Sequence, residues 1–96
     1  MYHRRKVDAN QPEIVSDVRK EGWDAQSIAA VGNGCPDLLV GAFGRNYIFE
    51  IKVVGGKMTL AEVDWHKKWI HGQKAVVYCF ADIKRIILED IKNATV

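Results

Sequence analysis

Three residues whose types could do chemistry stand in two short apolar stretches of the chain. Asp37 opens the first stretch, and Glu50 and Lys52 lie in the second, directly after the apolar residues 47–49. Charged residues are poorly suited to strand interiors and are rarely buried there unless they are paired. Their placement therefore calls for an explanation, either in function or in a structural ion pair.

The two stretches, residues 37–43 and 47–54, read as a hairpin because Gly44-Arg45-Asn46 separates them. Alternation along the second strand leaves Glu50 and Lys52 on one face, opposite the face of Tyr47, Phe49 and Ile51. A two-residue loop at Gly44-Arg45 would set Asp37 opposite Lys52. A loop at Arg45-Asn46 would keep Asp37 on the same face, whereas a three-residue loop would turn it away. We therefore expect Asp37, Glu50 and Lys52 to converge, provided that the loop is even.

Two carboxylates beside a lysine are suited to the hydrolysis of a phosphodiester. Carboxylate oxygens hold Mg²⁺, which can bind an oxygen of the scissile phosphate as a Lewis acid. The lysine can orient the attacking water and offset the charge that develops on the phosphate. A cross-strand salt bridge on an exposed sheet face is the structural alternative, and the spacing alone leaves it open.

The remaining elements follow from caps and apolar periodicity. Asn10, Pro12 and Gly22 suit a first helix with its N-cap, first turn and end, and residues 23–31 read as a strand. Thr59 suits the cap of a helix over residues 60–71, with Ala61, Trp65 and Trp69 as a core stripe. The sequence then predicts a strand over residues 75–80, with Cys79 buried in it, and a last helix capped by Asp82. The order of elements is helix, three strands, helix, strand, helix, which is an α/β layer fold.

Length and composition limit what the chain can be. Its 96 residues, 48% of them apolar, suffice for one domain with a modest core. No stretch has the roughly 20 apolar residues of a membrane helix, so we expect a cytosolic protein that is not bound to a membrane. The two cysteines lie far apart without metal-binding spacing, and we expect free thiols.

Basic residues form small clusters, although the formal net charge is only +2. Arg4, Arg5 and Lys6 lie in a polar stretch, residues 1–9, that we expect to be a flexible basic arm. His66, Lys67 and Lys68 lie on the helix predicted over residues 60–71. Such clusters could contact phosphates if they share a face, and an ordinary solvated surface is the alternative.

At the reactive residues the chain resembles a known superfamily. Gly34-Cys35-Pro36-Asp37 followed by Glu50-Ile51-Lys52 is similar to the G-x-P-D and E-x-K signature of the PD-(D/E)XK nucleases. The downstream residues 55–62 and Trp65-His66 resemble the stand-alone, phage-type members of the virus-type replication-repair nuclease (VRR-NUC) branch. The resemblance extends over about residues 13–77. It implies one restriction-endonuclease-like α/β domain over residues 1–96, of order αβββαβα, with a central mixed sheet flanked by helices.

The resemblance also implies roles for individual residues. Asp37 and Glu50 would be metal ligands, the backbone carbonyl of Ile51 a further ligand, and Lys52 the group that orients water. Glu13, in the first helix, corresponds to an acidic residue that many members use to contact a metal or its water. The structural alternative for Glu13 is a capping box with Asn10.

One position departs from the family pattern. Many members have a glutamine early in the helix after the E-x-K strand, where this chain has Glu62. A carboxylate there could contact metal-bound water, and the structural alternative for Glu62 is the capping box Thr59-x-x-Glu62. His66 and His71 read as surface helix residues rather than ligands, although His66 could touch DNA phosphates.

These observations lead to an expected function. The resemblance implies an endonuclease that uses Mg²⁺ or Mn²⁺ to cut DNA, with preference for branched or flapped forms. We expect it to act in the cytoplasm, or in the host cytoplasm if the chain is phage-encoded. We expect phosphate contacts from Lys57, Lys67, Lys68 and the arm, and a homodimer, because so small a domain covers little DNA. The alternatives are a nucleic-acid-binding or scaffold module that does not cleave, and a purely structural α/β protein.

Overall fold

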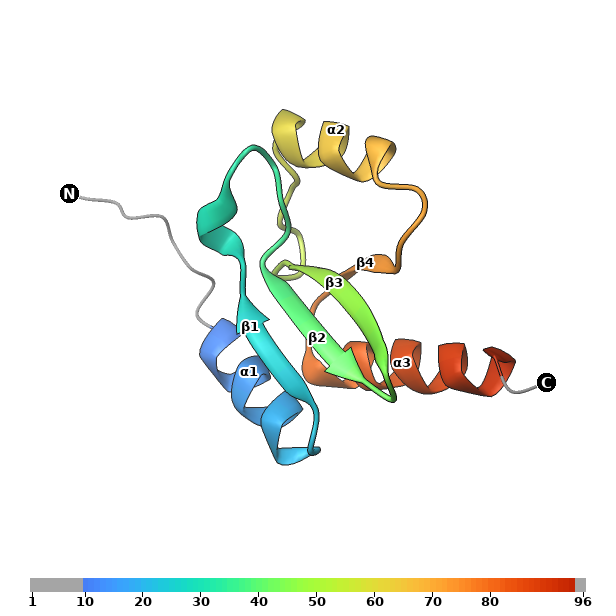
Figure 1. The fold of residues 1–96 in the computed structure, drawn as a ribbon. Helices are drawn as coiled ribbons and strands as arrows, with labels where there is room; N and C mark the ends of the chain where they lie inside the picture. The colour runs from blue at the N-terminus through green and yellow to red at the C-terminus, as the bar shows by residue number, and fades with distance from the viewer. Residues whose placement is uncertain (1–9, 95–96) are drawn as a thin grey trace.

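The computed structural model describes residues 10–94 and has the expected order of elements (Figure 1). In chain order these are α1 (Gln11–Lys20), β1 (Asp24–Ser27), a 3₁₀ helix η1 (Ala29–Val31), β2 (Leu38–Ala42), β3 (Arg45–Ile51), α2 (Leu60–Lys68), β4 (Lys74–Val77) and α3 (Phe80–Ala94). The sheet has the strand order β1-β2-β3-β4. Its first two pairings are antiparallel, and β4 runs parallel to β3. The predicted α/β class with a mixed sheet is confirmed, and α2 lies in the crossover that a parallel pair requires.

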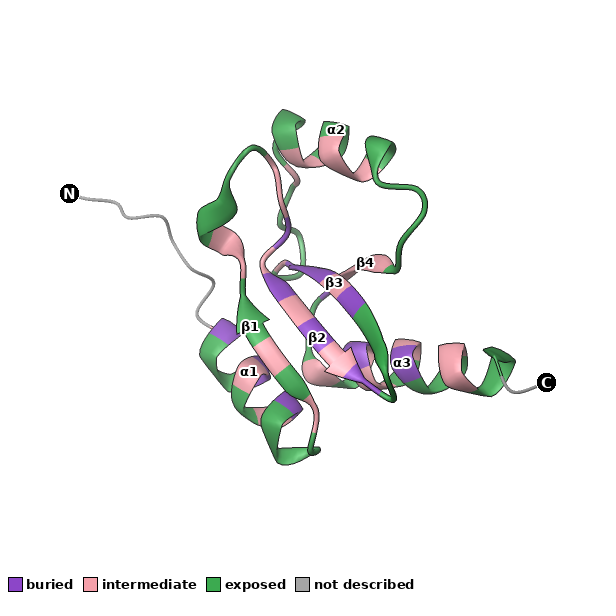
Figure 2. Cartoon of the chain, in the orientation of Figure 1, coloured by how far each residue is buried: buried purple, intermediate pink, exposed green. Residues whose placement is uncertain are grey.

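The core lies between one face of the sheet and the helices α1 and α3 (Figure 2). Alternate strand residues point into it, because successive side chains of a strand point to opposite faces. The helices contribute residues spaced four apart, which lie on one helical face. The members buried most completely are Val18, Leu38, Val40, Tyr47, Phe49, Ile51, Val77, Ile83 and Ile87. Among the described helices, none has the length and apolar character to cross a membrane.

The hairpin between β2 and β3 closes through Phe43 and Gly44, whose φ angles are 58° and 76°. Two consecutive residues in the left-handed region are what a tight two-residue hairpin turn of this kind requires. The loop is even, as the hypothesis needed, but it lies one position earlier than predicted. Leu38 pairs with Phe49, so the register sets Asp37 opposite Glu50 rather than Lys52. The predicted partner is wrong, while the shared face is kept because the pairing moved by an even number of residues.

The helix α2 differs most from its prediction. It ends at Lys68 rather than near residue 71, and none of its nine residues is buried. Trp69 follows the helix with non-helical angles and is 43% exposed. The predicted core stripe is therefore wrong, because α1 and α3 already cover the apolar face of the sheet and α2 lies apart from them (Figure 1).

All four strands are shorter than predicted, and the two outer strands differ most from their predictions. The first covers only Asp24–Ser27, and the chain then forms the 3₁₀ helix over Ala29–Val31. The last strand stops at Val77, so that Cys79 is exposed beyond it instead of buried within it. Apolar composition extended both predictions, since it does not distinguish a strand from an apolar loop.

Two predicted helix caps are replaced by other contacts. Asn10 makes no capping bond with its side chain, and its amide donates instead to the carbonyl of Tyr78, 68 positions away. Asp82 lies within the first turn of α3, which begins at Phe80, and its carboxylate accepts a bond from the Tyr78 N–H. Both side chains therefore bind the backbone of Tyr78, directly after the end of β4.

Gly34 sets how closely the loop before β2 approaches α2. Its φ is +84°, and a Cβ placed on it would collide with the backbone carbonyl of Ala61 in the first turn of α2. A backbone atom cannot move aside as the end of a flexible side chain can. The first glycine of the G-x-P-D motif is therefore needed both for its conformation and for its lack of a side chain.

We predict that Gly34→Ala destabilises the protein more than Gly22→Ala. Gly22 also has a positive φ, +91°, but an added Cβ there meets nothing within 4 Å. Gly22→Ala should therefore lose only the stability that the positive φ costs an alanine, roughly 1–2 kcal/mol. Gly34→Ala should lose about 1–3 kcal/mol more, because its Cβ overpacks the contact with α2. Thermal and denaturant unfolding measure both. Equal losses of stability would contradict the close contact with α2.

Candidate active site

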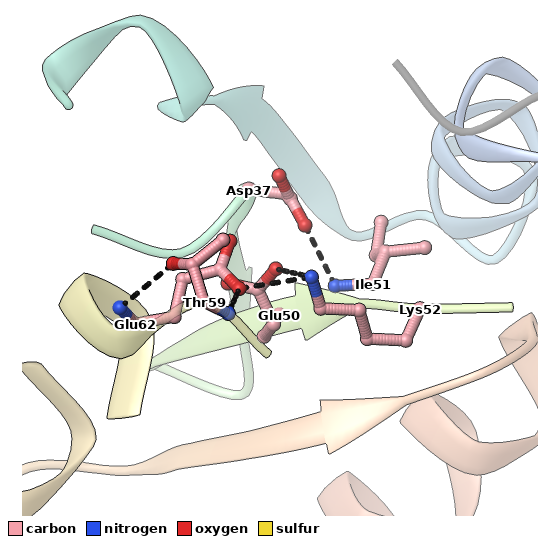
Figure 3. A network of polar contacts seen from close by, with 6 residues as sticks. All are labelled: Asp37, Glu50, Ile51, Lys52, Thr59 and Glu62. Carbon is pink, nitrogen blue, oxygen red and sulfur yellow. Dashed lines mark hydrogen bonds and ion pairs between the residues drawn. The ribbon is translucent and has the colours of Figure 1, made fainter. Parts of the chain in front are cut away.

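The structure brings Asp37, Glu50 and Lys52 together at one end of the hairpin (Figure 3). The Glu50 side chain is only 2% exposed, and its Oε2 lies 3.4 Å from the Lys52 Nζ. The Asp37 Oδ2 accepts a hydrogen bond of 2.8 Å from the N–H of Ile51. The backbone of β3 therefore orients the carboxylate contributed from the start of β2. Spacing alone predicted this convergence, and the geometry agrees with it.

Glu62, from the first turn of α2, reaches the same group. Its Oε1 lies 2.9 Å from the Lys52 Nζ and also accepts the N–H of Thr59 at 2.9 Å. The Thr59 hydroxyl in turn accepts the N–H of Glu62, which completes the predicted capping box. The local motif indicated the cap. Nothing in the sequence indicated that the same oxygen would also bind Lys52.

Burial and neighbouring charges shift the pKa values in this group. Burial raises the pKa of Glu50 to about 8, and the charges of Asp37 and Glu62 act in the same direction against the opposing effect of Lys52. Burial lowers the pKa of Lys52, but bonds and charges from Glu62 and Glu50 outweigh it and leave the pKa above its usual value. Burial raises the pKa of Glu62, but its bonds from Lys52 and Thr59 hold it below the usual value. Lys52 and Glu62 thus form a charged pair, whereas the charge of Glu50 is incompletely compensated, which favours its protonated form in the metal-free protein at neutral pH.

The donor set fits a divalent cation. The Oε1 of Glu50 is buried and has no hydrogen-bond partner. A buried carboxylate oxygen in that state is costly, and a cation would satisfy it. Within residues 10–94, no group of three or more His, Cys, Asp or Glu side chains is arranged to hold a metal. The available ligands are therefore Asp37 and Glu50, and Mg²⁺ commonly uses one or two carboxylates with water and phosphate oxygens.

Two of the residues implied by the resemblance contribute less to this group. Ile51 has its side chain in the core, and the role expected for its carbonyl stays a prediction. Glu13 is exposed on α1, where Asn10 forms no capping bond. The contacts found among residues 10–94 do not join Glu13 to Asp37, Glu50 or Lys52. Its metal-contacting role also stays a prediction.

The basic residues expected to contact DNA are placed unequally. Lys57 and Lys67 are exposed, and Lys68 is exposed but paired with Asp64 at 3.0 Å. His66 is half-buried, and burial followed by the charge of Lys74 lowers its pKa against the opposing charge of Glu62. The arm residues Arg4, Arg5 and Lys6 lie outside the described residues.

Cys35 also belongs to this neighbourhood, which sequence spacing did not reveal. Both cysteines are free thiols, as expected. Burial raises the pKa of the Cys35 thiol, and the charges of Glu50 and Asp37 raise it further. The thiol is therefore protonated at neutral pH and adds no charge to the group.

The fold and the paired carboxylates define a small α/β domain with a candidate hydrolytic centre, and one solved structure gives that fold a name. No protein-family model matches the chain, and no curated protein matches it in sequence. A solved structure described as "VRR_NUC domain" aligns with a TM-score of 0.65 over 80% of this chain and 88% of its own, at 22% sequence identity. The chain therefore has the fold of a VRR_NUC domain, and the fold implied by the resemblance is confirmed.

We predict that Glu50 makes the metal-free protein less stable as the pH rises. A carboxyl whose folded pKa is raised favours the folded state most at a pH below its unfolded value of about 4.5, and this contribution is lost as the pH rises to about 8. The expected loss is on the order of a few kcal/mol. In Glu50→Gln this part of the pH dependence should disappear, as melting from pH 4.5 to 8.5 would show.

The exposed Glu21, paired with Lys84 at 3.3 Å, provides the control for that measurement. Glu21→Gln should retain the pH dependence of the unchanged protein. A Glu50→Gln protein whose stability changes with pH as much as the original would contradict the burial of an unsatisfied charge at this position.

Proposed function

We propose that this protein is a metal-dependent endonuclease that hydrolyses DNA phosphodiester bonds. The observation that supports this most directly is the buried Glu50, whose Oε1 lacks a partner, beside Asp37 and Lys52. The shared fold with a structure named for a nuclease domain adds support. Mg²⁺ or Mn²⁺ is the cofactor that this donor set suits.

A bound divalent cation would supply Lewis acidity and charge neutralisation at the scissile phosphate. Asp37 and Glu50 would hold it, and the N–H of Ile51 keeps the Asp37 carboxylate oriented. Lys52 is held between Glu50 and Glu62, at 3.4 Å and 2.9 Å. An ammonium group has three donors, so one remains to orient the attacking water or to bind a phosphate oxygen.

The structural alternative, an ion pair that only stabilises the fold, explains part of this geometry. Lys52 does lie between two carboxylates. A structural pair, however, would satisfy the buried charge, whereas here the pKa of Glu50 is raised to about 8 and one of its oxygens has no partner. Incomplete compensation of this kind is typical of functional sites, which stabilise an absent ligand instead of the empty fold.

The shape of the DNA and the association of two copies are further parts of this proposal. No segment of the sequence is suited to reading base edges, so we propose that the protein selects branched or flapped DNA by shape. We also propose that two copies associate, which would place two cutting centres on a symmetric junction.

Incubation of the purified protein with linear, flapped and four-way-junction DNA, with and without Mg²⁺ or Mn²⁺, tests this function. Cleavage that EDTA abolishes supports the nuclease. Binding without cleavage under every metal condition would favour a module that only binds nucleic acid. Absence of both binding and cleavage would favour the purely structural protein.

We predict that alanine substitutions separate the roles within the site. Asp37→Ala and Glu50→Ala remove an anionic ligand and should weaken metal binding and cleavage together. Lys52→Ala should preserve metal binding while cleavage falls by about 100-fold or more, the scale for loss of one transition-state contact. Calorimetric metal titration and cleavage assays measure the two effects.

Thermal melting of the same three variants distinguishes a catalytic site from a structural one. Removal of either carboxylate relieves repulsion in the metal-free protein, so its stability should not collapse. Normal cleavage by Lys52→Ala, or an Asp37→Ala protein that melts much earlier yet still cleaves, would contradict the proposed roles.

We predict that Lys67 contributes to DNA affinity through phosphate contact. Each phosphate neutralised on duplex DNA adds roughly 0.9 to the slope of log affinity against log salt concentration. Lys67→Gln should lower that slope, and Lys68→Gln should lower it less because Lys68 is paired with Asp64. Binding isotherms across salt concentrations, with Lys20→Gln on α1 as control, measure the effect. An unchanged slope in Lys67→Gln would make this residue an ordinary surface lysine.

A further inference from the structure

Two tryptophans form a stacked pair at the end of α2. The rings of Trp65 and Trp69 lie 5.0 Å apart with an interplanar angle of 11°. Trp65 is half-buried and Trp69 is 43% exposed. Large aromatic residues usually lie in the core, but here Trp65 belongs to a helix with no buried residue and Trp69 directly follows that helix.

The position of the Trp69 ring is fixed from a second side. A Cβ placed on Gly72 would lie only 2.7 Å from the Trp69 Nε1. The indole therefore lies against the backbone at residue 72, where a glycine leaves the necessary room. A ring held by Trp65 and by the backbone loses little freedom when a ligand binds, which favours affinity.

The surroundings of Trp69 suit an anionic partner with flat rings. A hollow of about 250 Å³ is lined by Lys68, Trp69, Ile70, His71 and Gly72. The last turn of α2 contributes two exposed lysines, Lys67 and Lys68, of which Lys68 is paired with Asp64. An exposed aromatic ring beside cations is the arrangement by which proteins bind single-stranded nucleic acid, with bases stacked on the ring and phosphates near the cations. The charge of the exposed Lys67 favours that occupant over an apolar protein partner.

The distance from this surface to the candidate active site suits one continuous strand. Trp69 follows Glu62 by seven positions, or roughly 10 Å along a helix at 1.5 Å per residue. One strand of duplex DNA advances about 3.4 Å per nucleotide, and an unpaired strand can be extended further, so this length corresponds to at most about three nucleotides.

We propose that Trp69 stacks on an unpaired base of single-stranded or flapped DNA, within about three nucleotides of the bond that is cut. The inference rests on the proposed nuclease function for the position of the cut only. The stacking itself requires neither metal nor cleavage.

Binding in EDTA tests the proposal, with a single-stranded oligo-dT and a hairpin duplex as probes. Oligo-dT should quench tryptophan fluorescence of the unchanged protein, and its affinity should fall roughly 5- to 100-fold in Trp69→Leu, the range for loss of one stacked base. Trp69→Phe should retain part of that affinity. Leu88→Ala is the matched control, because Leu88 on α3 is 43% exposed, as Trp69 is, but lies outside this hollow and has no ring, and it should bind as the unchanged protein does.

The other outcomes overturn the proposal. The first is that the unchanged protein neither binds oligo-dT nor shows quenched fluorescence with it. The second is that Trp69→Leu binds oligo-dT as tightly as the unchanged protein does. The third is that Trp69→Leu loses as much affinity for the hairpin duplex as for oligo-dT. A Trp69→Leu protein whose mass halves by light scattering without a change in oligo-dT affinity would show that a second copy covers this surface. A protein that binds oligo-dT through Trp69 yet cleaves no DNA with any metal would contradict the nuclease function alone.

Discussion

The ion pair from Lys52 to Glu50 and Glu62 is the interaction on which the arrangement of the site depends. Lys52 directly follows β3, Glu62 lies in the first turn of α2, and the buried Glu50 lies within 3.4 Å of the Lys52 ammonium group. The ammonium group offsets part of the charge on Glu50 and links a helix outside the core to the central strand. Because the offset is incomplete, the site retains a negative potential that a divalent cation would relieve. The same contact therefore stabilises the position of α2 and leaves a negative potential that suits the proposed cation.

The core makes this arrangement possible because it determines the register of β3. Tyr47, Phe49 and Ile51 are each about 1% exposed on the face that packs against α1 and α3. A slip of one residue would exchange these side chains with Glu50 and its neighbours, which would place Glu50 in the apolar core and remove two aromatic rings from it. Apolar packing on one face thus fixes the position of the charged residues on the other. The N–H of Ile51 makes the connection directly, since it belongs to a core residue and binds Asp37.

Sequence reasoning recovered the features that depend on local patterns. The order of elements, the convergence of Asp37, Glu50 and Lys52, and the Thr59 capping box all follow from alternation, turn signals and short motifs. The pairing of Asp37 with Glu50 was missed, because Phe43 adopts a left-handed conformation that its residue type disfavours. The exposure of Trp69 was missed as well, because helical periodicity shows which residues share a face but not whether another element covers it. The contact between Glu62 and Lys52 depends on how the crossover folds back, and no local signal encodes it.

The position of α2 has a consequence for how the molecule opens. Elements with few buried contacts exchange their amide hydrogens through local openings that need much less free energy than global unfolding. The helix α2 has no buried residue, whereas β2, β3 and α3 share the core. Its amides should therefore exchange earlier than those of the sheet, and each such opening would release Lys52 from Glu62 while Asp37 and Glu50 stay in place. The contact that positions Lys52 and the two carboxylates proposed to hold a cation thus depend on regions of different local stability.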